Sequence, residues 1–480
     1  MSSPNTETGV LVNDIHSRLN PTWVRGIQRP DSAAALQAAI VQAGRAGWGV
    51  SVSGGRHAMG GQQFGTDTLL LDMRGLDAAG PVNAEAGTVE VGAGIQWPAL
   101  INHLERSQAE QAKSGARTWA IAQKQTGANA LTLGGAISSN VHGRGLCMAP
   151  FISDVDSFTL VDVQGKRHVC DRTQNAELFR LAAGGYGLFG VIDSLVLRLT
   201  PRRKLERVVS VLPLNELLPS MESRIGEGFL YGDFQYVTDE TSPDFLRRGV
   251  FSCYRPVDDA TPFTPSHKHL TSEDWRRLAG LAHTDKARAF EVYAAHYLST
   301  SGQIYWSDRH QEAVYDDDYH RGLGGSAALS SEVIAELYVP RPRLVDFLDT
   351  VREDFRRHSV NLIYGTIRLI QPDTNSFLAW AKAPYACVIF NLHTEHTPEG
   401  IAHTADAFRR LIDNAAERGG SYYLAYGRDA TRAQVERCYP QFAEFLRLKR
   451  VYDPEERFVS DWYRHYCQLF EQNQLFEQNQ

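Results

Sequence analysis

Two basic residues between pairs of glycines are the first candidates for chemistry in this chain. Arg56 and His57 lie in the stretch VSVSGGRHAMGGQQF, where Ser53-Gly54-Gly55 ends an apolar run and Gly60-Gly61 breaks the chain again. Glycine permits a tight turn and a close approach of the backbone, so the amide groups of such a loop can face an anion. Taken alone, this pattern is more typical of a plain turn, and a lone histidine in it of a loop residue hydrogen-bonded to backbone.

Two further glycine-rich stretches follow in order. GANALTLGGAISSNVHG spans residues 127–143, and GGYGLFGVI spans residues 184–192. Three ordered stretches at these spacings indicate a cofactor cradle far more strongly than one glycine-rich loop. Together they resemble the FAD-binding domain of the vanillyl-alcohol oxidase and p-cresol methylhydroxylase flavoprotein family.

Length and composition fit a globular protein of two domains. The chain has 480 residues, of which 43% are hydrophobic and 22% charged, enough for two sizeable cores. The net charge of −7, without a basic block, argues against nucleic acid as a partner. No apolar run is long enough for a membrane span, and the first residues lack the features of a signal peptide. Six scattered cysteines without a CxxC pair favour free thiols over disulfides or a zinc site, so we expect a cytoplasmic protein.

The first two hundred residues alternate between helical and strand-like segments. A helix is predicted over 33–45, capped by Asp31 or Ser32 and ended by Gly47. Further helices are predicted over 97–105 and 177–183, and strands over 49–52, 68–72, 88–92, 156–163, 166–170 and 190–199. This alternation indicates an α/β or α+β arrangement with a parallel component.

The pattern changes after Pro201-Arg202-Arg203. From Val208 to Ala425, strand-like runs alternate with longer helical segments, which predicts one antiparallel sheet with helices on one face. These runs are FQYVTD, GVFSCYR, QIYWSD, EVIAELYVP, LIYGTIRLI, YACVIFNLH and SYYLAY. The last twelve residues, LFEQNQ twice, show no periodic apolar face and are interpreted as a frayed tail.

The resemblance implies a fold class and a domain division. The expected fold is α+β, with a two-subdomain FAD-binding domain of the p-cresol methylhydroxylase type and an antiparallel-sheet substrate (cap) domain. The FAD-binding domain is expected over 1–205 and the cap domain over 206–430. Residues 431–480 are expected to return to the FAD-binding domain.

The resemblance also implies FAD as cofactor and a set of residues that bind it. The turn before His57 resembles those of alditol oxidases and cytokinin dehydrogenases, so His57 is expected to carry FAD covalently. No cysteine occurs in TGANALTLGG, so a second covalent link is not expected. The expected FAD-binding residues are Ser53, Gly54, Gly55, Arg56, His57, Ala58, Gly60, Gln62, Gly127, Thr132, Gly134, Gly135, Ser138, Asn140, His142, Gly143, Gly187, Gly190 and Ile192.

The C-terminal part resembles the sugar oxidases that act on decaprenylphosphoryl-ribose. The shared order is a CV-x-F strand at 387–390, a GG pair, a cation before Asp429, a Tyr-Pro pair and a DP…F-x-SD ending at 453–461. Two departures are clear. Those enzymes have a serine where this chain has His57, and their catalytic lysine and its partner tyrosine fall on Arg428 and Ala425, with Tyr426 one place along.

Strand alternation gives a second view of the catalytic residues. Side chains two positions apart share a face, so each of four strand-like runs offers polar groups on one face. Alternation alone favours a solvated face, whereas the resemblance puts this face over the flavin. The candidate catalytic residues are Arg428, Tyr426, His393, Glu336 and Arg368.

The resemblance implies an FAD-linked oxidase or dehydrogenase acting on CH–OH donors. The expected reaction is hydride transfer from an alcohol, polyol or sugar-like small molecule to flavin N5, with O2 as acceptor. His393, Tyr426 and Glu336 remain alternative bases, while Arg428 stays protonated and suits stabilising negative charge. The alternatives are a dehydrogenase that uses a quinone or other acceptor, oxidation of a CH–NH group, or a non-catalytic flavin-binding protein.

Overall fold

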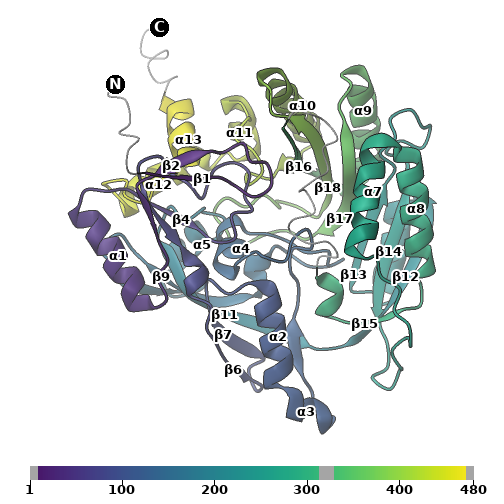
Figure 1. Cartoon of the computed structure of the whole chain (residues 1–480), viewed down its shortest axis with the longest axis horizontal. Helices are drawn as coiled ribbons and strands as arrows, with labels where there is room; N and C mark the ends of the chain where they lie inside the picture. Colours follow the sequence, from purple (N-terminus) through teal and green to yellow (C-terminus); the bar gives the residue numbers. More distant parts are fainter. Residues whose placement is uncertain (1–8, 313–328, 472–480) are drawn as a thin grey trace.

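The first half of the chain begins with a small parallel sheet. The computed structural model describes residues 9–312 and 329–471 (Figure 1). Strands β3 (Gly26–Gln28), β5 (Leu69–Asp72) and β4 (Val50–Ser53) pair in parallel in that order, and β1 (Val10–Val12) pairs with β2 (Thr22–Val24). Helix α1 (Ala33–Arg45) begins where the Ser32 side chain accepts a hydrogen bond from the Ala35 amide. The predicted helix and its cap are therefore confirmed.

A six-stranded antiparallel sheet follows. Its order is β10-β9-β11-β7-β6, with β8 paired to β11. The strands are β6 (Ala79–Asn83), β7 (Thr88–Gly92), β8 (Trp119–Ile121), β9 (Val155–Val161), β10 (Arg167–Cys170) and β11 (Val191–Pro201). The helices are α2 (Trp97–Ser107), α3 (Ala109–Lys113), α4 (Leu133–Ser139) and α5 (Ala176–Ala182). Helix α4 lies near the centre of the molecule (Figure 1).

The second half forms an eight-stranded antiparallel sheet, which agrees with the α+β class. Its order is β15-β12-β14-β13-β17-β18-β16-β19. The strands are β12 (Lys204–Pro213), β13 (Tyr231–Tyr236), β14 (Arg248–Pro256), β15 (Ile304–Trp306), β16 (Ser330–Pro340), β17 (Leu362–Ile370), β18 (Tyr385–Glu395) and β19 (Ser421–Tyr422). The helices are α6 (Leu217–Gly226), α7 (Ser272–Thr284), α8 (Lys286–Ser299), α9 (Leu344–Arg357) and α10 (Pro398–Glu417). Short 3₁₀ turns cover Met73–Gly75, Phe151–Asp154, Leu214–Glu216, Arg309–Gln311 and Arg341–Arg343.

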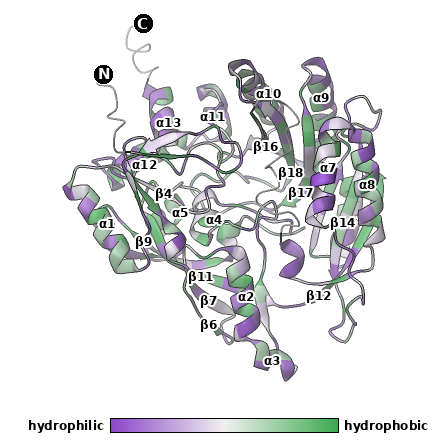
Figure 2. Cartoon of the chain, in the orientation of Figure 1, coloured by the Kyte–Doolittle hydropathy of each residue, from purple (hydrophilic) through white to green (hydrophobic). Residues whose placement is uncertain are grey.

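Helices cover both faces of this sheet, so the prediction of helices on one face is wrong. Directly paired residues share a face, and the register aligns Val250, Gln235, Thr366 and Ile389 across four strands. Helix α8 packs against Val250 on this face. Helix α9 packs its phenylalanines against Phe390 on the opposite face. Both faces of these strands carry buried apolar residues, such as Val250 on one face and Phe390 on the other, although the first face also carries buried polar residues such as Gln235. Figure 2 shows green segments on these strands.

The C-terminal helices contact the first parallel sheet. They are α11 (Arg432–Cys438), α12 (Phe442–Tyr452) and α13 (Asp461–Glu471). The Val50 amide donates to the Arg457 carbonyl at 2.6 Å, and the Val459 amide donates to the Val50 carbonyl at 2.9 Å. Asp461 accepts a hydrogen bond from the Thr66 hydroxyl at 2.8 Å. The division at 205 and 430 stays a prediction.

Two local expectations need correction. The repeat LFEQNQ is not wholly a frayed tail, because residues 469–471 belong to α13 and Phe470 stacks on Phe442 with ring centroids 5.3 Å apart. Residues 472–480 lie outside the described part of the chain. The strand predicted in SYYLAY ends at Tyr422, so Tyr426 and Arg428 lie beyond it and their face cannot be derived from strand alternation. Across residues 9–312 and 329–471, every helix is too short or too polar to cross a membrane.

Candidate active site

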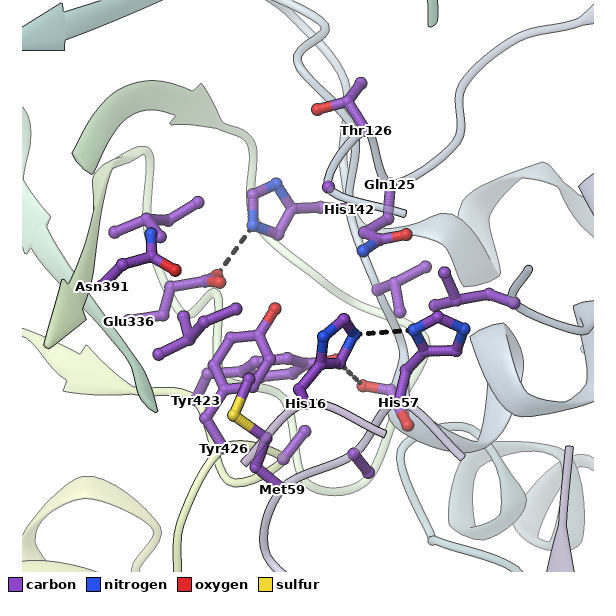
Figure 3. Close-up of a pocket in the computed structure, with 18 of the residues that line it drawn as sticks. His16, His57, Met59, Gln125, Thr126, His142, Glu336, Asn391, Tyr423 and Tyr426 are labelled. Atoms are coloured by element: carbon purple, nitrogen blue, oxygen red, sulfur yellow. Dashed lines mark hydrogen bonds and ion pairs between the residues drawn. The ribbon is translucent and has the colours of Figure 1, made fainter. Parts of the chain in front are cut away.

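A cavity of about 380 Å³ lies between the glycine-rich loops and one face of the eight-stranded sheet. Its first wall consists of residues from the three glycine-rich stretches predicted to hold a cofactor. Its second wall comes from strands β12, β13, β16, β17 and β18, from helices α7 and α8, and from the loop after β19. Figure 3 shows both walls, with His57 and Gln125 on one side and Glu336 and Asn391 on the other.

Most of the predicted cofactor residues lie in the wall of this cavity. They are Gly54, Gly55, Arg56, His57, Ala58, Gln62, Gly127, Thr132, Gly134, Gly135, Ser138, His142, Gly187, Gly190 and Ile192. Among the described residues, the cavity wall does not include Ser53, Gly60, Asn140 or Gly143. Asn140 instead ends helix α4 in a left-handed conformation, and its buried amide donates to Asp373 at 2.7 Å.

The first glycine pair is required by packing within the protein. A Cβ atom at Gly54 would lie 2.0 Å from Oγ1 of Thr132, and one at Gly55 would lie 2.1 Å from the carbonyl oxygen of Ala130. The expected reason, close approach of the backbone to a cofactor, is therefore not the only one. Arg56 follows with a φ of 61°, a costly conformation for a residue with a side chain. The loop is thus held in one strained shape by the second glycine-rich stretch.

The cavity wall contains polar atoms that an FAD molecule would satisfy. Nε of Arg56, Oε1 of Gln63 and Oε1 of Gln125 are buried and have no hydrogen-bond partner in the described parts of the chain. All three residues line the cavity. Buried polar groups without partners cost free energy, so such groups commonly mark where a ligand binds. The residues present therefore fit the expected cofactor.

His57 forms a buried pair with a residue that sequence reasoning missed. Its Nδ1 lies 2.7 Å from Nε2 of His16 (Figure 3). Burial lowers the pKa of His57 to about 3, with a further lowering by His16 that the nearby Ala130 carbonyl only partly opposes. His57 is therefore neutral at ordinary pH, as a nucleophilic nitrogen must be. Nε2 of His57 is buried and makes no hydrogen bond of acceptable geometry among the described residues.

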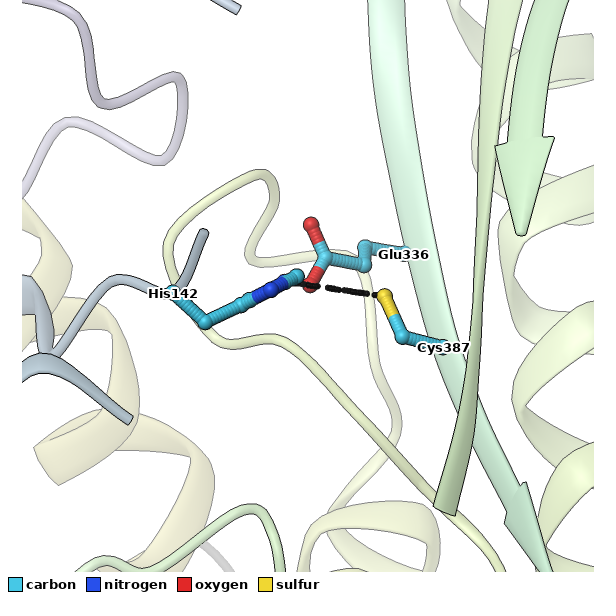
Figure 4. A group of neighbouring side chains, drawn as sticks. All are labelled: His142, Glu336 and Cys387. Atoms are coloured by element: carbon cyan, nitrogen blue, oxygen red, sulfur yellow. Dashed lines mark hydrogen bonds and ion pairs between the residues drawn. The ribbon is translucent and has the colours of Figure 1, made fainter. Parts of the chain in front are cut away.

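His142 joins the glycine-rich wall to the sheet. Its Nε2 lies 2.8 Å from Oε1 of Glu336 (Figure 4). Its Nδ1 lies 2.8 Å from the carbonyl oxygen of Gly143. Both partners can accept a hydrogen bond, and the contact with Glu336 is an ion pair only when the imidazole is protonated. Burial would raise the pKa of Glu336, but the charge and hydrogen bond of His142, together with the Tyr338 hydroxyl, bring this pKa below its usual value.

Two further side chains complete this cluster. Cys387 places its sulfur 3.5 Å from Oε1 of Glu336 (Figure 4), and burial raises the pKa of this thiol well above its usual value, so it remains protonated. Arg368 donates to the Thr126 hydroxyl at 2.7 Å and to the Gly143 carbonyl at 3.4 Å. The cluster at the cavity wall therefore holds one carboxylate, one imidazole and one guanidinium.

The five predicted catalytic residues do not all converge. Glu336, Arg368 and Tyr426 line the cavity, whereas in the described structure the cavity wall does not include His393 or Arg428. Nδ1 of His393 instead lies 3.2 Å from Glu332, which does line the cavity. Arg428 lies in the irregular segment after β19 and not in a strand. The strand pairing that was expected to place its side chain over the cavity is therefore absent at this residue.

Sequence reasoning missed the arginines at the other end of the cavity. The Arg207 guanidinium lies 5.1 Å from the ring centroids of Tyr254 and Tyr297 and 4.8 Å from that of Tyr305. It donates to the Tyr254 hydroxyl at 2.8 Å and lines the cavity. Arg144 also lines it and pairs with Asp233 at 3.2 Å. Arg207 lies in β12, which was not among the predicted strands, whereas Arg144 directly follows the second glycine-rich stretch and could have been considered.

Comparison with known proteins identifies the type of domain that forms the first wall of the cavity. The profile of a protein family described as an FAD binding domain matches residues 24–171. The chain therefore contains an FAD-binding domain of the p-cresol methylhydroxylase type, and the resemblance to that flavoprotein family is confirmed. Together with its distant relatives, this domain supports an FAD-dependent oxidoreductase.

Individual relatives are distant. Cytokinin dehydrogenase 9 of Oryza sativa subsp. japonica is 24% identical over 438 residues, which are 84% of this chain and 78% of that protein. L-gulono-1,4-lactone dehydrogenase of Mycobacterium tuberculosis is 23% identical over 441 residues, or 91% of this chain and 95% of that protein. L-gulonolactone oxidase of Bos taurus is 27% identical over 176 residues, 37% of each chain.

Gly135 offers a test of the cofactor wall that the packed glycines do not. A Cβ at Gly135 would meet only Oγ1 of Thr132, at 3.0 Å, so Gly135→Val should fold and place two methyl groups at the cavity wall. We expect this variant to retain less FAD than the parent protein, measured as flavin absorbance per purified chain. The matched control is Gly226→Val, where a Cβ meets nothing within 4 Å. Equal flavin content in both variants would remove Gly135 from the cofactor site.

Proposed function

We propose that this chain oxidises a CH–OH group of an alcohol, polyol or sugar-like substrate by hydride transfer to FAD, with O2 as the acceptor. The observation that carries this proposal is the buried carboxylate of Glu336 in the cavity wall, which lies 2.8 Å from His142 and is influenced by the charge of the Arg368 guanidinium. Oxidation of a hydroxyl group needs an acceptor for its proton and positive charge where negative charge develops. The similarity to a gulonolactone oxidase and a gulonolactone dehydrogenase is consistent with a CH–OH donor.

The cofactor supplies the redox step, since bound FAD accepts a hydride at its flavin ring. The protein residues bind and orient the substrate and handle the proton. Glu336 accepts the hydrogen bond of the substrate hydroxyl and then its proton, because its low pKa keeps the carboxylate ionised. His142 and Arg368 supply positive charge near the developing negative charge. Tyr426 is the alternative proton acceptor, since it also lines the cavity.

Arg144 and Arg207 would bind substrate oxygen atoms at the other end of the cavity. Their fixed guanidinium forks suit hydroxyl, carboxylate or phosphate oxygens, and the rings around Arg207 hold it in place. A sugar-like molecule presents oxygens along its whole length. This end of the cavity therefore supports an oxygen-rich substrate over a simple hydrocarbon alcohol.

The second candidate is oxidation of a CH–NH group, or a dehydrogenase that uses a quinone or another acceptor in place of O2. The similarity to cytokinin dehydrogenase 9 favours it, since cytokinins are amines. An ionised Glu336 would bind an ammonium group as readily as a hydroxyl group.

We also infer a cytoplasmic location, because all six cysteines are free. We further infer a division into domains over 1–205, 206–430 and 431–480.

A substrate panel tests this proposal. Purified protein is mixed without oxygen with alcohols, polyols, sugars, lactones and amines, and loss of the yellow absorbance is followed. We expect reduction by a sugar-like or polyol substrate, and oxygen consumption when air is readmitted. Reduction by amines alone would favour the second candidate. Slow reoxidation by O2 with rapid reoxidation by a quinone would identify a dehydrogenase, and no reduction by any compound would favour a flavin-binding protein without turnover.

Removal of the Glu336 charge should slow reduction of the flavin. Glu336→Gln keeps the shape of the side chain but removes the proton acceptor, and loss of such a group costs on the order of 3 kcal/mol, or about a hundredfold in rate. The measurement is the anaerobic rate of flavin reduction at saturating substrate. Glu353→Gln, at a largely exposed position, is the control. Parent-like reduction by Glu336→Gln would exclude this carboxylate as the base.

We further propose that FAD is covalently attached to His57, and that His16 assists the attachment. The neutral His57 can donate Nδ1–H to Nε2 of His16, which leaves the lone pair on Nε2 of His57 free to bond to the flavin 8α-methyl carbon. That methyl group would lose a proton as the bond forms, and O2 would take up the two electrons that the flavin gains. Acid precipitation should leave yellow colour with the protein, and His57→Ala should release all of it. We expect His16→Ala to slow incorporation of FAD into apoprotein, whereas exposed His403→Ala should not. Flavin that is wholly released from the parent protein would contradict the link.

A further inference from the structure

Three metal-ligating side chains meet at the edge of the cavity, away from the cluster around His142. His283 comes from helix α7, while Glu332 on β16 and His393 on β18 are direct partners in the sheet register. Oε1 of Glu332 lies 3.3 Å from Nε2 of His283 and 3.2 Å from Nδ1 of His393. The three ligand atoms all lie within 4.8 Å of one another. We propose that these residues form a Zn²⁺ site whose remaining coordination position opens to the cavity.

The spacing of the atoms is that of ligands around one ion. Zinc binds histidine nitrogen and carboxylate oxygen at about 2.0–2.2 Å, so two ligands of a tetrahedral site lie about 3.3 Å apart. The two separations measured from Glu332 match this value. His283 and Glu332 line the cavity, which gives an ion a path to the site and leaves a position for water or a substrate oxygen.

Unsatisfied atoms at the same place point to a missing ligand. Oε2 of Glu332 and Nε2 of His283 are both buried without a hydrogen-bond partner in residues 9–312 and 329–471. Glu332 is 7% exposed. Although Nε2 of His283 is near Glu332, it is not oriented to form a hydrogen bond to it. A simple ion pair would satisfy these atoms, whereas an ion between the three side chains can take the lone pairs of both.

The ligand types select the metal. Two imidazoles and one carboxylate suit Zn²⁺ and its neighbours Co²⁺ and Ni²⁺, while Ca²⁺ and Mg²⁺ need a shell of oxygen atoms. The other histidine–carboxylate–cysteine group, His142 with Glu336 and Cys387, is less suitable. Both nitrogens of His142 already face acceptors, and the thiol of Cys387 stays protonated because burial raises its pKa. A single ion should therefore bind, and it should bind at His283.

Zinc would tie helix α7 to the sheet. Trp275, Leu278 and His283 of this helix line the cavity, and His283 is its point of contact with Glu332. An ion that binds only the folded chain stabilises it, and the gain in unfolding free energy grows with the logarithm of the ion concentration relative to the dissociation constant. We therefore expect Zn²⁺ to raise the midpoint of thermal unfolding of the FAD-loaded protein, without any requirement for turnover.

The test measures zinc binding to the FAD-loaded protein by titration calorimetry, after treatment with a chelator. We expect one Zn²⁺ per chain. His283→Ala and Glu332→Gln should each weaken binding by more than about a hundredfold, since loss of an outer-shell partner alone can cost 10–100-fold. The control His403→Ala removes an exposed histidine and should bind as the parent does. Unchanged zinc affinity in His283→Ala would overturn the assignment, as would the lack of a one-to-one site in the parent.

Co²⁺ gives a second measurement that needs no variant, in case a substitution prevents folding. Cobalt at His283, Glu332 and His393 should show visible d–d bands without a thiolate-to-cobalt charge-transfer band, because no sulfur is a ligand. A strong charge-transfer band would place the ion at Cys387 and overturn the proposal. The result is independent of the proposed oxidation, because neither measurement uses a substrate.

Discussion

The buried ion pair between His142 and Glu336 is the interaction on which the active site depends. It joins the second glycine-rich stretch to the centre of strand β16, 194 residues later, and both side chains are almost fully buried. Charges taken out of water are stable only when paired and fully hydrogen-bonded, and here Gly143 and Tyr338 supply the additional contacts. The pair links the two walls of the cavity. The groups that we assign to proton transfer therefore also fix the position of the sheet relative to the cofactor loops.

Much of the fold could be predicted because it follows local rules. Helix α1 was found from its apolar residues, its Ser32 cap and the glycine after it, and most strands of the two large sheets from strand-like runs, although β6, β8 and β12 were not predicted. The helices that cover the cavity face could not be predicted, because that face carries both apolar and polar residues and the pattern of a strand does not tell which helix lies on it. The end of β19 at Tyr422 was also missed. The residues after it in SYYLAY are still typical of a strand, although the chain leaves the sheet there.

The site was predictable where one short stretch supplies several residues. The glycine-rich loops and His57 belong to such stretches, and most of them line the cavity. His16 and Arg207 could not be found, because each lies in a segment without a motif and reaches the site through tertiary packing alone. Arg428 shows the opposite error. A resemblance in sequence order suggested a catalytic position, but the loop that carries it is outside the strand register on which that placement depended.

Two histidine–carboxylate pairs on the same strand face have different environments, and this difference separates their proposed roles. Glu332 and Glu336 are four residues apart on β16, so their side chains share the cavity face. Oε1 of Glu336 already accepts hydrogen bonds from His142 and the Tyr338 hydroxyl. Glu332 has one oxygen without a partner and two imidazoles beside the other. The first arrangement suits a preorganised proton acceptor, and the second suits a ligand set that still lacks its metal.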